Sequence, residues 1–183
     1  MTENNTSEKL VLAYNRMMER VKAALEHAGH DTLPSVQQHI ESAKKKAVEL
    51  GELTREEAEK IGTYVKRDLH DAADYLTVTG KELAAWLRFD MKLVEQRVLD
   101  VFSTMVDRTR QELDKLGLRA KVADESKNTN IWHTGEVTGV GTLSCAACGQ
   151  PMHFHATGRI PPCPKCYATR FRRISGNNQE NSE

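Results

Sequence analysis

Aromatic side chains are scarce in this sequence, where they make up only 5% of 183 residues. Strands of large β domains are enriched in aromatic and β-branched residues, so this scarcity argues against such a fold. Charged residues reach 28% and the mean hydropathy is −0.58, values typical of a solvated, helix-rich chain with a modest core. The sequence therefore predicts a mainly α protein, long enough for one ordinary domain and a small second one.

Long hydrophobic runs are also lacking. No apolar stretch approaches the roughly 20 residues that a membrane-spanning helix requires. Residues 1–8 are polar and lack the basic and apolar regions of a signal peptide. We therefore expect a cytoplasmic protein with no membrane partner. In that compartment thiols stay reduced, so paired cysteines are expected to bind a metal rather than to form disulfides.

The familiar catalytic motifs are missing too. The sequence has no glycine-rich phosphate-binding loop, no nucleophile elbow and no His-Glu-x-x-His zinc motif. One predicted helix does gather polar side chains, at Tyr64, Lys66, Arg67, Asp68 and Asp71. Their spacing is that of ordinary i, i+4 pairs on a helix surface. We therefore expect no catalytic residues, and a protein that is not an enzyme.

Apolar residues in the first 118 positions recur in alternating steps of three and four, a spacing that places them on one stripe of a helix. Four such stripes begin at Val11, Val36, Ala58 and Leu83. Because the turns between them are short, the pattern predicts a bundle of antiparallel, coiled-coil-like helical hairpins. Thr54 and Glu57 have the spacing of a capping box, which predicts that the third helix begins there.

The last predicted helix is the longest. It runs from about Gly80 to Leu116, which gives a length on the order of 55 Å. The first and third helices have predicted lengths of about 30–35 Å, so the last one outruns them. This overhang is suited to meeting a second copy of the chain, and we therefore consider a homodimer formed through the long helix.

The pattern changes after residue 118. Residues 119–130 are polar and without periodicity, which predicts a flexible linker after a helical domain over 1–118. Residues 131–175 consist of short β-like pieces that alternate with two Cys-x-x-Cys pairs, the layout of a zinc ribbon. Residues 176–183 are polar, and we expect them to form a disordered tail.

All four cysteines of the chain lie in this ribbon, as the pairs Cys145/Cys148 and Cys163/Cys166. Two such pairs complete a tetrahedral shell around one ion and leave no open position. They therefore predict one structural Zn²⁺, which supplies stability that so small a core lacks. Two alternatives use the same residues. One is a rubredoxin-like iron centre for electron transfer, and the other is a thiol–disulfide redox protein.

The ribbon is basic, whereas the helical region is mildly acidic. Residues 131–175 hold five basic side chains and one acid, a balance of +4 before the metal, and residues 1–118 hold 18 basic and 21 acidic ones, a balance of −3. At the end of the ribbon, arginines flank an aromatic residue, and such a run can contact phosphates while the ring stacks on a base. The alternative is an edge strand with its phenylalanine buried beneath it. The predicted contact surface comprises Trp132, Phe154, Arg159, Arg170, Phe171, Arg172 and Arg173.

Four stretches carry a more specific pattern. They are Gly-Glu-Leu-Thr-Arg-Glu-Glu at 51–57, Tyr-Val-Lys-Arg-Asp-Leu at 64–69, Thr-Gly-Val-Gly-Thr-Leu at 138–143 and Ile-Pro-Pro-Cys-Pro-Lys-Cys at 160–166. In this linked pattern the chain resembles the YbeL-like family of bacterial zinc-ribbon-containing proteins of unknown function. Tyr167 departs from many zinc knuckles, which carry glycine after the last cysteine. The resemblance implies a helical domain plus a zinc ribbon in a cytoplasmic bacterial protein, and it brings no assigned activity.

A closed metal site, the missing catalytic motifs and the basic ribbon together favour a non-enzymatic adaptor or regulator. In this hypothesis the helical body docks a protein partner. The ribbon contacts protein or nucleic acid, either RNA or DNA. The alternative function is that of the iron or thiol redox protein described above.

Overall fold

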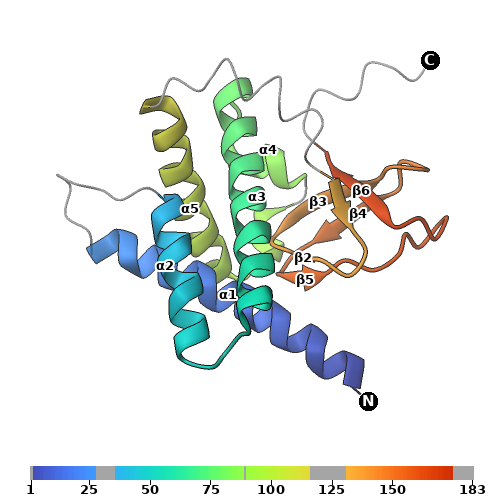
Figure 1. The fold of residues 1–183 in the computed structure, drawn as a ribbon. Helices are drawn as coiled ribbons and strands as arrows, with labels where there is room; N and C mark the ends of the chain where they lie inside the picture. The colour runs from blue at the N-terminus through green and yellow to red at the C-terminus, as the bar shows by residue number, and fades with distance from the viewer. Residues whose placement is uncertain (1, 28–35, 89, 116–130, 175–183) are drawn as a thin grey trace.

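The computed structural model describes residues 2–27, 36–88, 90–115 and 131–174, so the predicted linker and tail lie outside the described residues. The helical part comprises α1 (Thr2–His27), α2 (Val36–Glu49), α3 (Arg55–Thr79), α4 (Leu83–Leu87), the 3₁₀ turn η1 (Met91–Leu93) and α5 (Gln96–Lys115). The strands are β1 (Ile131–His133), β2 (Val137–Thr138), β3 (Gly141–Cys145), β4 (Pro151–Phe154), β5 (Gly158–Arg159) and β6 (Arg170–Arg173). Helices followed by a small β ribbon confirm the predicted fold class (Figure 1).

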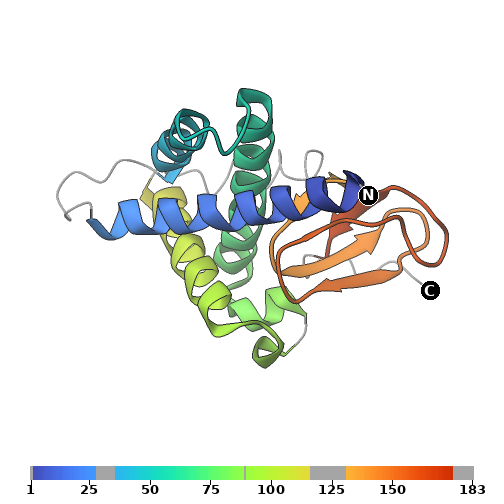
Figure 2. The same cartoon turned by 90° about the horizontal axis from the view of Figure 1, so that it is seen from below.

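The four longer helices pack against one another and bury the predicted apolar stripes. Inward-facing side chains with no more than 1% exposure include Tyr14, Val21, Ile61, Leu69 and Met105. Figure 2 shows α1 running across the other helices, with its N-terminal end beside the ribbon. In the described part of the chain, none of the helices combines the length and the apolar character needed to span a bilayer.

The start and the end of α3 follow directly from the sequence. The Thr54 side chain accepts a hydrogen bond from the Glu57 backbone N–H at 3.2 Å, and the Glu57 carboxylate accepts one from the Thr54 backbone N–H at 2.8 Å. This reciprocal pair is the predicted capping box. At the other end Gly80 adopts a left-handed φ of 65°, which terminates the helix at low steric cost.

The prediction of one long helix from about Gly80 to Leu116 is wrong. Arg88 adopts a left-handed φ of 63° and ends α4 after five residues. Asp90 then caps η1 by accepting a hydrogen bond from the Lys92 backbone N–H at 2.9 Å. Val94 is extended, and α5 begins only at Gln96.

Tertiary contacts explain this break. The chain turns back so that the indole of Trp86 stacks on Phe102, with ring centroids 5.4 Å apart. The Leu87 carbonyl accepts a hydrogen bond of 2.6 Å from the Thr142 hydroxyl of the ribbon. A continuous helix would place the rings 16 positions apart along one axis, about 24 Å. With 20 residues, α5 is shorter than α1 and α3, so the described residues lack the overhang on which the homodimer prediction was based.

The ribbon contains two small antiparallel sheets. Strands β1, β6, β3 and β4 form one sheet in that order, and β2 pairs with β5 in the other. Strand β6 therefore lies inside its sheet, paired with β1 and β3, and is not the edge strand considered from the sequence. Val137 and Val140 belong to the same apolar core as the helices, whereas Trp132, Leu143 and Phe171 form a second core within the ribbon.

Candidate metal centre and its junction with the helices

The four cysteines converge on one point, as the sequence predicts. Their Sγ atoms all lie within 4.8 Å of one another. The Sγ atoms of Cys145 and Cys166 are 3.5 Å apart, and those of Cys148 and Cys163 are 3.6 Å apart. A tetrahedron with metal–sulfur bonds of about 2.3 Å has an edge of about 3.8 Å, so the sulfur positions fit a single four-coordinate ion.

Two knuckles of the same design position these thiols. In the first, the Gly149 backbone N–H donates to the Cys145 carbonyl at 2.9 Å, and Gly149 has a φ of 72°. In the second, the Tyr167 backbone N–H donates to the Cys163 carbonyl at 2.9 Å, and Tyr167 has a φ of 59°. Tyr167 thus adopts a left-handed conformation that suits glycine.

Electrostatics indicates that the site needs a cation. Burial opposes ionisation of Cys163, but the backbone N–H groups of Cys166 and Lys165 outweigh it and lower the pKa of this thiol to about 6. The Ala168 N–H favours the Cys166 thiolate, yet the neighbouring sulfurs, that of Cys148 above all, raise the pKa of Cys166 to about 12. Four sulfurs this close cannot all be thiolates unless a metal ion lies among them.

The site is closed in chemical terms. Cys145 and Cys163 are buried, Cys148 is half-buried and Cys166 is exposed. Four protein sulfurs complete a tetrahedral shell and leave no position for water or substrate, which is the pattern of structural metal sites. The same donor set suits zinc and iron.

Comparison with known proteins places the chain in a family. A sequence model of the zinc-ribbon containing domain matches residues 23–175. The chain belongs to this family. It is similar to the uncharacterized protein YbeL of Escherichia coli strain K12 and of Escherichia coli O6:H1, each 28% identical over 138 residues that cover 73% of this chain and 79% of the relative. No solved structure matches. The family match spans helices and ribbon together, and it confirms the resemblance inferred from the sequence.

In this member of the zinc-ribbon containing domain family, Asp68 joins the ribbon to the helices. Its Oδ2 accepts hydrogen bonds from Tyr14 Oη at 2.9 Å, from Thr138 Oγ1 at 3.1 Å and from the Gly139 backbone N–H at 2.7 Å. Its Oδ1 accepts one from Trp132 Nε1 at 3.0 Å. One fully buried carboxylate of α3 therefore binds α1 and two segments of the ribbon through charge-assisted bonds.

Arg173, at the end of β6, balances this charge. Its Nη2 donates to Asp68 Oδ1 at 3.3 Å and to Thr138 Oγ1 at 3.0 Å. The guanidinium carbon lies 4.9 Å from the ring centroids of both Trp86 and Trp132, within the range of cation–π attraction. A buried arginine thus contacts one tryptophan of the helices and one of the ribbon.

A second carboxylate extends the network within the helical body. Trp86 Nε1 donates to Asp71 Oδ2 at 2.9 Å. Burial raises the pKa of the Asp71 carboxyl, while the Arg173 guanidinium, whose Nε lies 3.7 Å away, opposes that shift. We name the group of Asp68, Asp71, Trp86, Trp132 and Arg173 the junction network.

Arg67 adds an ion pair at the margin of the junction. Its Nη1 donates to Glu136 Oε2 at 2.6 Å, and its guanidinium carbon lies 4.5 Å from the Trp132 ring centroid. Glu136 is the single acid of residues 131–174. The ribbon therefore directs its one negative side chain toward the helices.

The predicted contact surface is corrected at three residues. Trp132 and Phe171 are fully buried and Arg173 is 4% exposed, because these three face the ribbon core or the junction network. Their side chains therefore do not form an outer surface. Arg159, Arg170 and Arg172 are exposed, and Phe154 is half-buried.

The exposed arginines of β6 belong to what we call the open face of the four-stranded sheet. Arg172 pairs with Ile131 on one side and with Ser144 on the other, and Arg170 pairs with His133. Residues directly opposite in antiparallel strands point to the same side of a sheet, so these side chains share one surface. Phe171 and Arg173 alternate with Arg170 and Arg172 and point to the other side of the sheet. There Phe171 packs in the ribbon core and Arg173 reaches the helices.

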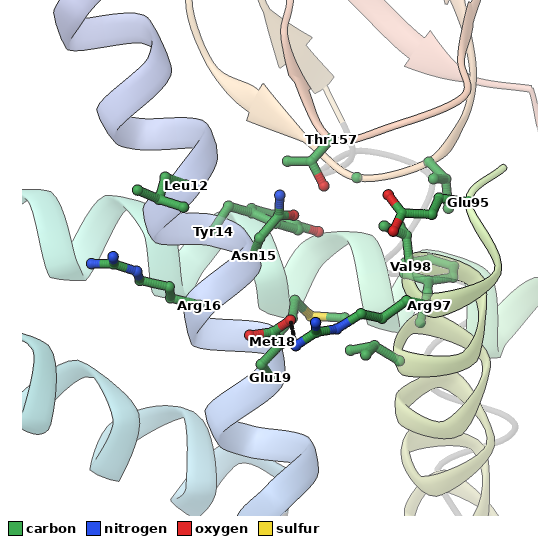
Figure 3. Close-up of a pocket in the computed structure, with 14 residues that line it drawn as sticks. Leu12, Tyr14, Asn15, Arg16, Met18, Glu19, Glu95, Arg97, Val98 and Thr157 are labelled. Carbon is green, nitrogen blue, oxygen red and sulfur yellow. Dashed lines mark ion pairs between the residues drawn. The ribbon is translucent and has the colours of Figure 1, made fainter.

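A cleft lies where α1, the start of α5 and the ribbon meet (Figure 3). Its volume is about 380 Å³. Met18, Val101 and Phe102 supply buried apolar walls. At its edge Arg97 and Glu19 form an ion pair of 2.8 Å.

Sequence reasoning did not identify Asp68 as a buried residue, because the polar residues around it in the sequence suggested ordinary side-chain pairs on the helix surface. One signal was present. Asp68 follows Val65 by three residues and precedes Ala72 by four, so it lies on the apolar stripe of α3 rather than on the solvated side. A charged residue on such a stripe is almost never fully buried without a partner, and the partners here are distant in sequence.

Proposed function

We propose that the protein is a non-enzymatic, zinc-binding adaptor whose ribbon presents a contact surface at a fixed place on a helical body. The proposal rests on one observation: the two sides of the four-stranded ribbon sheet have different surroundings. One side is anchored to the helices through Asp68 and Arg173. The other side, the open face, carries the exposed cations Arg170 and Arg172, which lie outside the junction network.

Zn²⁺ is the proposed metal, with one ion per chain held by Cys145, Cys148, Cys163 and Cys166. The family description and the tetrahedral sulfur geometry support it. With four sulfurs bound, the ion has a structural role: it fixes both knuckles and thereby the strands that leave them. Structural zinc in small domains is worth about 10–16 kcal/mol at neutral pH, enough to fold a ribbon whose own core is small.

The helical body is the proposed docking site for a protein partner, at the cleft shown in Figure 3. Apolar walls with a rim of both charge signs suit a protein surface better than a polyanion. Leu12, at the edge of the cleft, is 50% exposed and offers an apolar contact there.

Capture of partners from the native cell tests the proposal. The full chain is compared with Arg170→Ala/Arg172→Ala, which alters the open face, and with Leu12→Glu, which alters the cleft. Lys45→Ala/Lys60→Ala is the charge-matched control, since both lysines are exposed on the helical body. Each sample is divided and treated with or without nuclease.

The proposal expects one defined partner to be lost with a surface variant and retained with the lysine control. It also expects one zinc per purified chain and no absorbance of iron thiolate. Capture that is identical for all variants would contradict the adaptor role. One iron per chain would contradict the metal assignment and favour electron transfer.

A further inference from the structure

Tyr167 is the most exposed of the large hydrophobic side chains in the described chain, at 79%. It also adopts a φ of 59°, a conformation that disfavours any residue with a Cβ atom. At the equivalent position of the first knuckle, Gly149 has a φ of 72° and its N–H makes the equivalent hydrogen bond. The second knuckle thus retains an aromatic ring in solvent at a cost in backbone strain. Backbone strain that no packing of the side chain compensates is typical of functional positions.

The charged side chains that the ribbon leaves exposed are all basic. The ribbon's one acid, Glu136, forms an ion pair with Arg67 of α3, and its buried arginine, Arg173, forms one with Asp68 of α3. Both charges are therefore neutralised by the helices. The charged side chains left exposed on the ribbon are Arg159, Lys165, Arg170 and Arg172. Within the described residues, no ion pair engages any of these four. They outweigh the charge of −2 on a zinc ion bound by four thiolates.

The ring and two of the cations follow one another along the chain. Tyr167 precedes Arg170 by three residues, so their Cα atoms are at most roughly 11 Å apart. Arg170 and Arg172 point to the same side of β6, at a spacing of about 7 Å. Ser144 and His133 lie opposite them on the neighbouring strands and add groups capable of hydrogen bonding. An exposed aromatic residue thus lies within three residues of a short row of cations.

We propose that this row binds single-stranded nucleic acid, with Tyr167 stacked on a base and with Arg170 and Arg172 on the backbone phosphates. The inference rests on the adaptor function and names the partner of its open face. Cations along a strand with an aromatic stacking platform are the common design of single-strand binding sites. A duplex keeps its bases stacked inside, so the exposed ring favours an unpaired strand. An acidic protein would match the arginines but would leave the strained tyrosine without a role.

Fluorescence anisotropy with the zinc-loaded full chain tests this inference. The probes are labelled single-stranded oligouridylate and oligothymidylate of about 16 nucleotides, together with a duplex of equal length. We expect both single strands to bind more tightly than the duplex. With about two phosphate contacts, the logarithm of the binding constant should fall with the logarithm of salt at a slope of about −1.4.

Tyr167→Gly is the decisive variant, because glycine relieves the strain of the knuckle and preserves its fold. We expect binding about 5- to 150-fold weaker, the range for losing one stacked base, together with unchanged zinc content and an equal or higher melting temperature. Tyr167→Phe should bind as the parent does. Arg170→Ala and Arg172→Ala should each reduce the salt slope by about 0.7, whereas Lys45→Ala/Lys60→Ala should change nothing.

Three results would overturn the inference: no binding of any single strand at low salt, tighter binding of the duplex, or unchanged binding by Tyr167→Gly. A nuclease-resistant protein partner lost with Arg170→Ala/Arg172→Ala, without oligonucleotide binding, would refute the nucleic-acid assignment and leave the adaptor function standing. Failure of both experiments would refute both proposals.

Discussion

Asp68 of α3 and Arg173 of β6 form an ion pair that is closed to solvent. Nη2 lies 3.3 Å from Oδ1, and the two side chains are 0% and 1% exposed. They are 105 residues apart in the chain, so the pair specifies how the ribbon meets the helices. Buried pairs of this kind contribute little net stability over apolar residues, but removal of one partner leaves a costly buried charge.

Asp68→Ala should therefore destabilise the protein strongly. The substitution leaves the buried Arg173 guanidinium with only the Asp71 carboxylate, 3.7 Å from its Nε, and removes the acceptor used by Tyr14 and Trp132. We expect the free energy of unfolding in urea to fall by about 3–5 kcal/mol. Asp107→Ala, at an exposed position of α5, is the control and should change it by less than about 0.5 kcal/mol. Equal effects of the two substitutions would show that the pair does not hold the junction together.

The parts of the fold that the sequence predicts depend on local chemistry. The Thr54–Glu57 capping box acts within one turn of helix and is present as expected. The two Cys-x-x-Cys pairs fold into knuckles through bonds within a few residues, so their spacing alone indicates a four-sulfur site. Such features require no knowledge of which distant segments meet.

The features that sequence analysis missed depend on contacts between distant segments. The apolar stripe continues past Leu87 with helical spacing, and the segment between Gly80 and Gly117 contains no glycine or proline. The break there follows from the stacking of Trp86 on Phe102 and from the Thr142 bond. The position of Asp68 on the apolar stripe of α3 likewise does not identify its partners, which come from the ribbon and from α1. Tertiary contacts override local propensity at both places.

Removal of the metal should unfold more than the ribbon. Val137 and Val140 of the ribbon belong to the helical core, and the ribbon supplies partners for Asp68. We therefore expect a chelator to lower the melting temperature of the helices, measured by far-ultraviolet circular dichroism. Both tryptophans, Trp86 and Trp132, contact Arg173, so intrinsic fluorescence reports the junction directly.

The two signals together decide whether helices and ribbon unfold as a unit. We expect coincident transitions with metal and a shared shift after chelation, as for one cooperative unit. Cys163→Ser should reproduce the shift without chelator. A change in fluorescence with an unaltered helix transition would instead indicate that the ribbon folds and unfolds separately, as a flexible linker would allow.

Stability should fall as pH rises toward neutrality because of Asp74. Burial, with the charge of Asp71, raises the pKa of this carboxyl to about 7. Below about pH 4 the group is protonated in both states and has no effect. Between about pH 4 and 7 the folded protein binds more protons than the unfolded chain, so unfolding becomes easier as pH rises. Above about pH 7 the carboxyl is ionised in both states, and the loss of folding stability stays at its full value.

Asp74→Asn removes this titration and isolates its contribution. We expect the urea midpoint of the variant to exceed that of the parent at about pH 8 and the difference to shrink at about pH 4. Asp107→Asn, exposed on α5, should show no such dependence. A difference that grows toward acid pH would mean that the charged Asp74 carboxylate stabilises the folded protein, the opposite of what its burial implies.

Gly141 permits the close approach of ribbon and helices, and its replacement should weaken the junction. Its φ is 136°, and a Cβ atom there would lie 2.6 Å from Arg173 Nη1 and 3.0 Å from Cη2 of the Trp86 ring.

Gly51 is the control, because its φ is 67° and nothing lies within 4 Å of its Cβ position. Gly51→Ala should cost about 1–2 kcal/mol from backbone strain alone. Gly141→Ala should cost more, both because a φ of 136° lies outside the left-handed region that alanine can adopt and because overpacking adds about 1–3 kcal/mol. It should also alter tryptophan fluorescence, which Gly51→Ala should leave unchanged. Equal unfolding free energies for the two variants would mean that the junction adapts to a methyl group at Gly141, and that the approach of Arg173 and Trp86 to this strand is looser than their distances indicate.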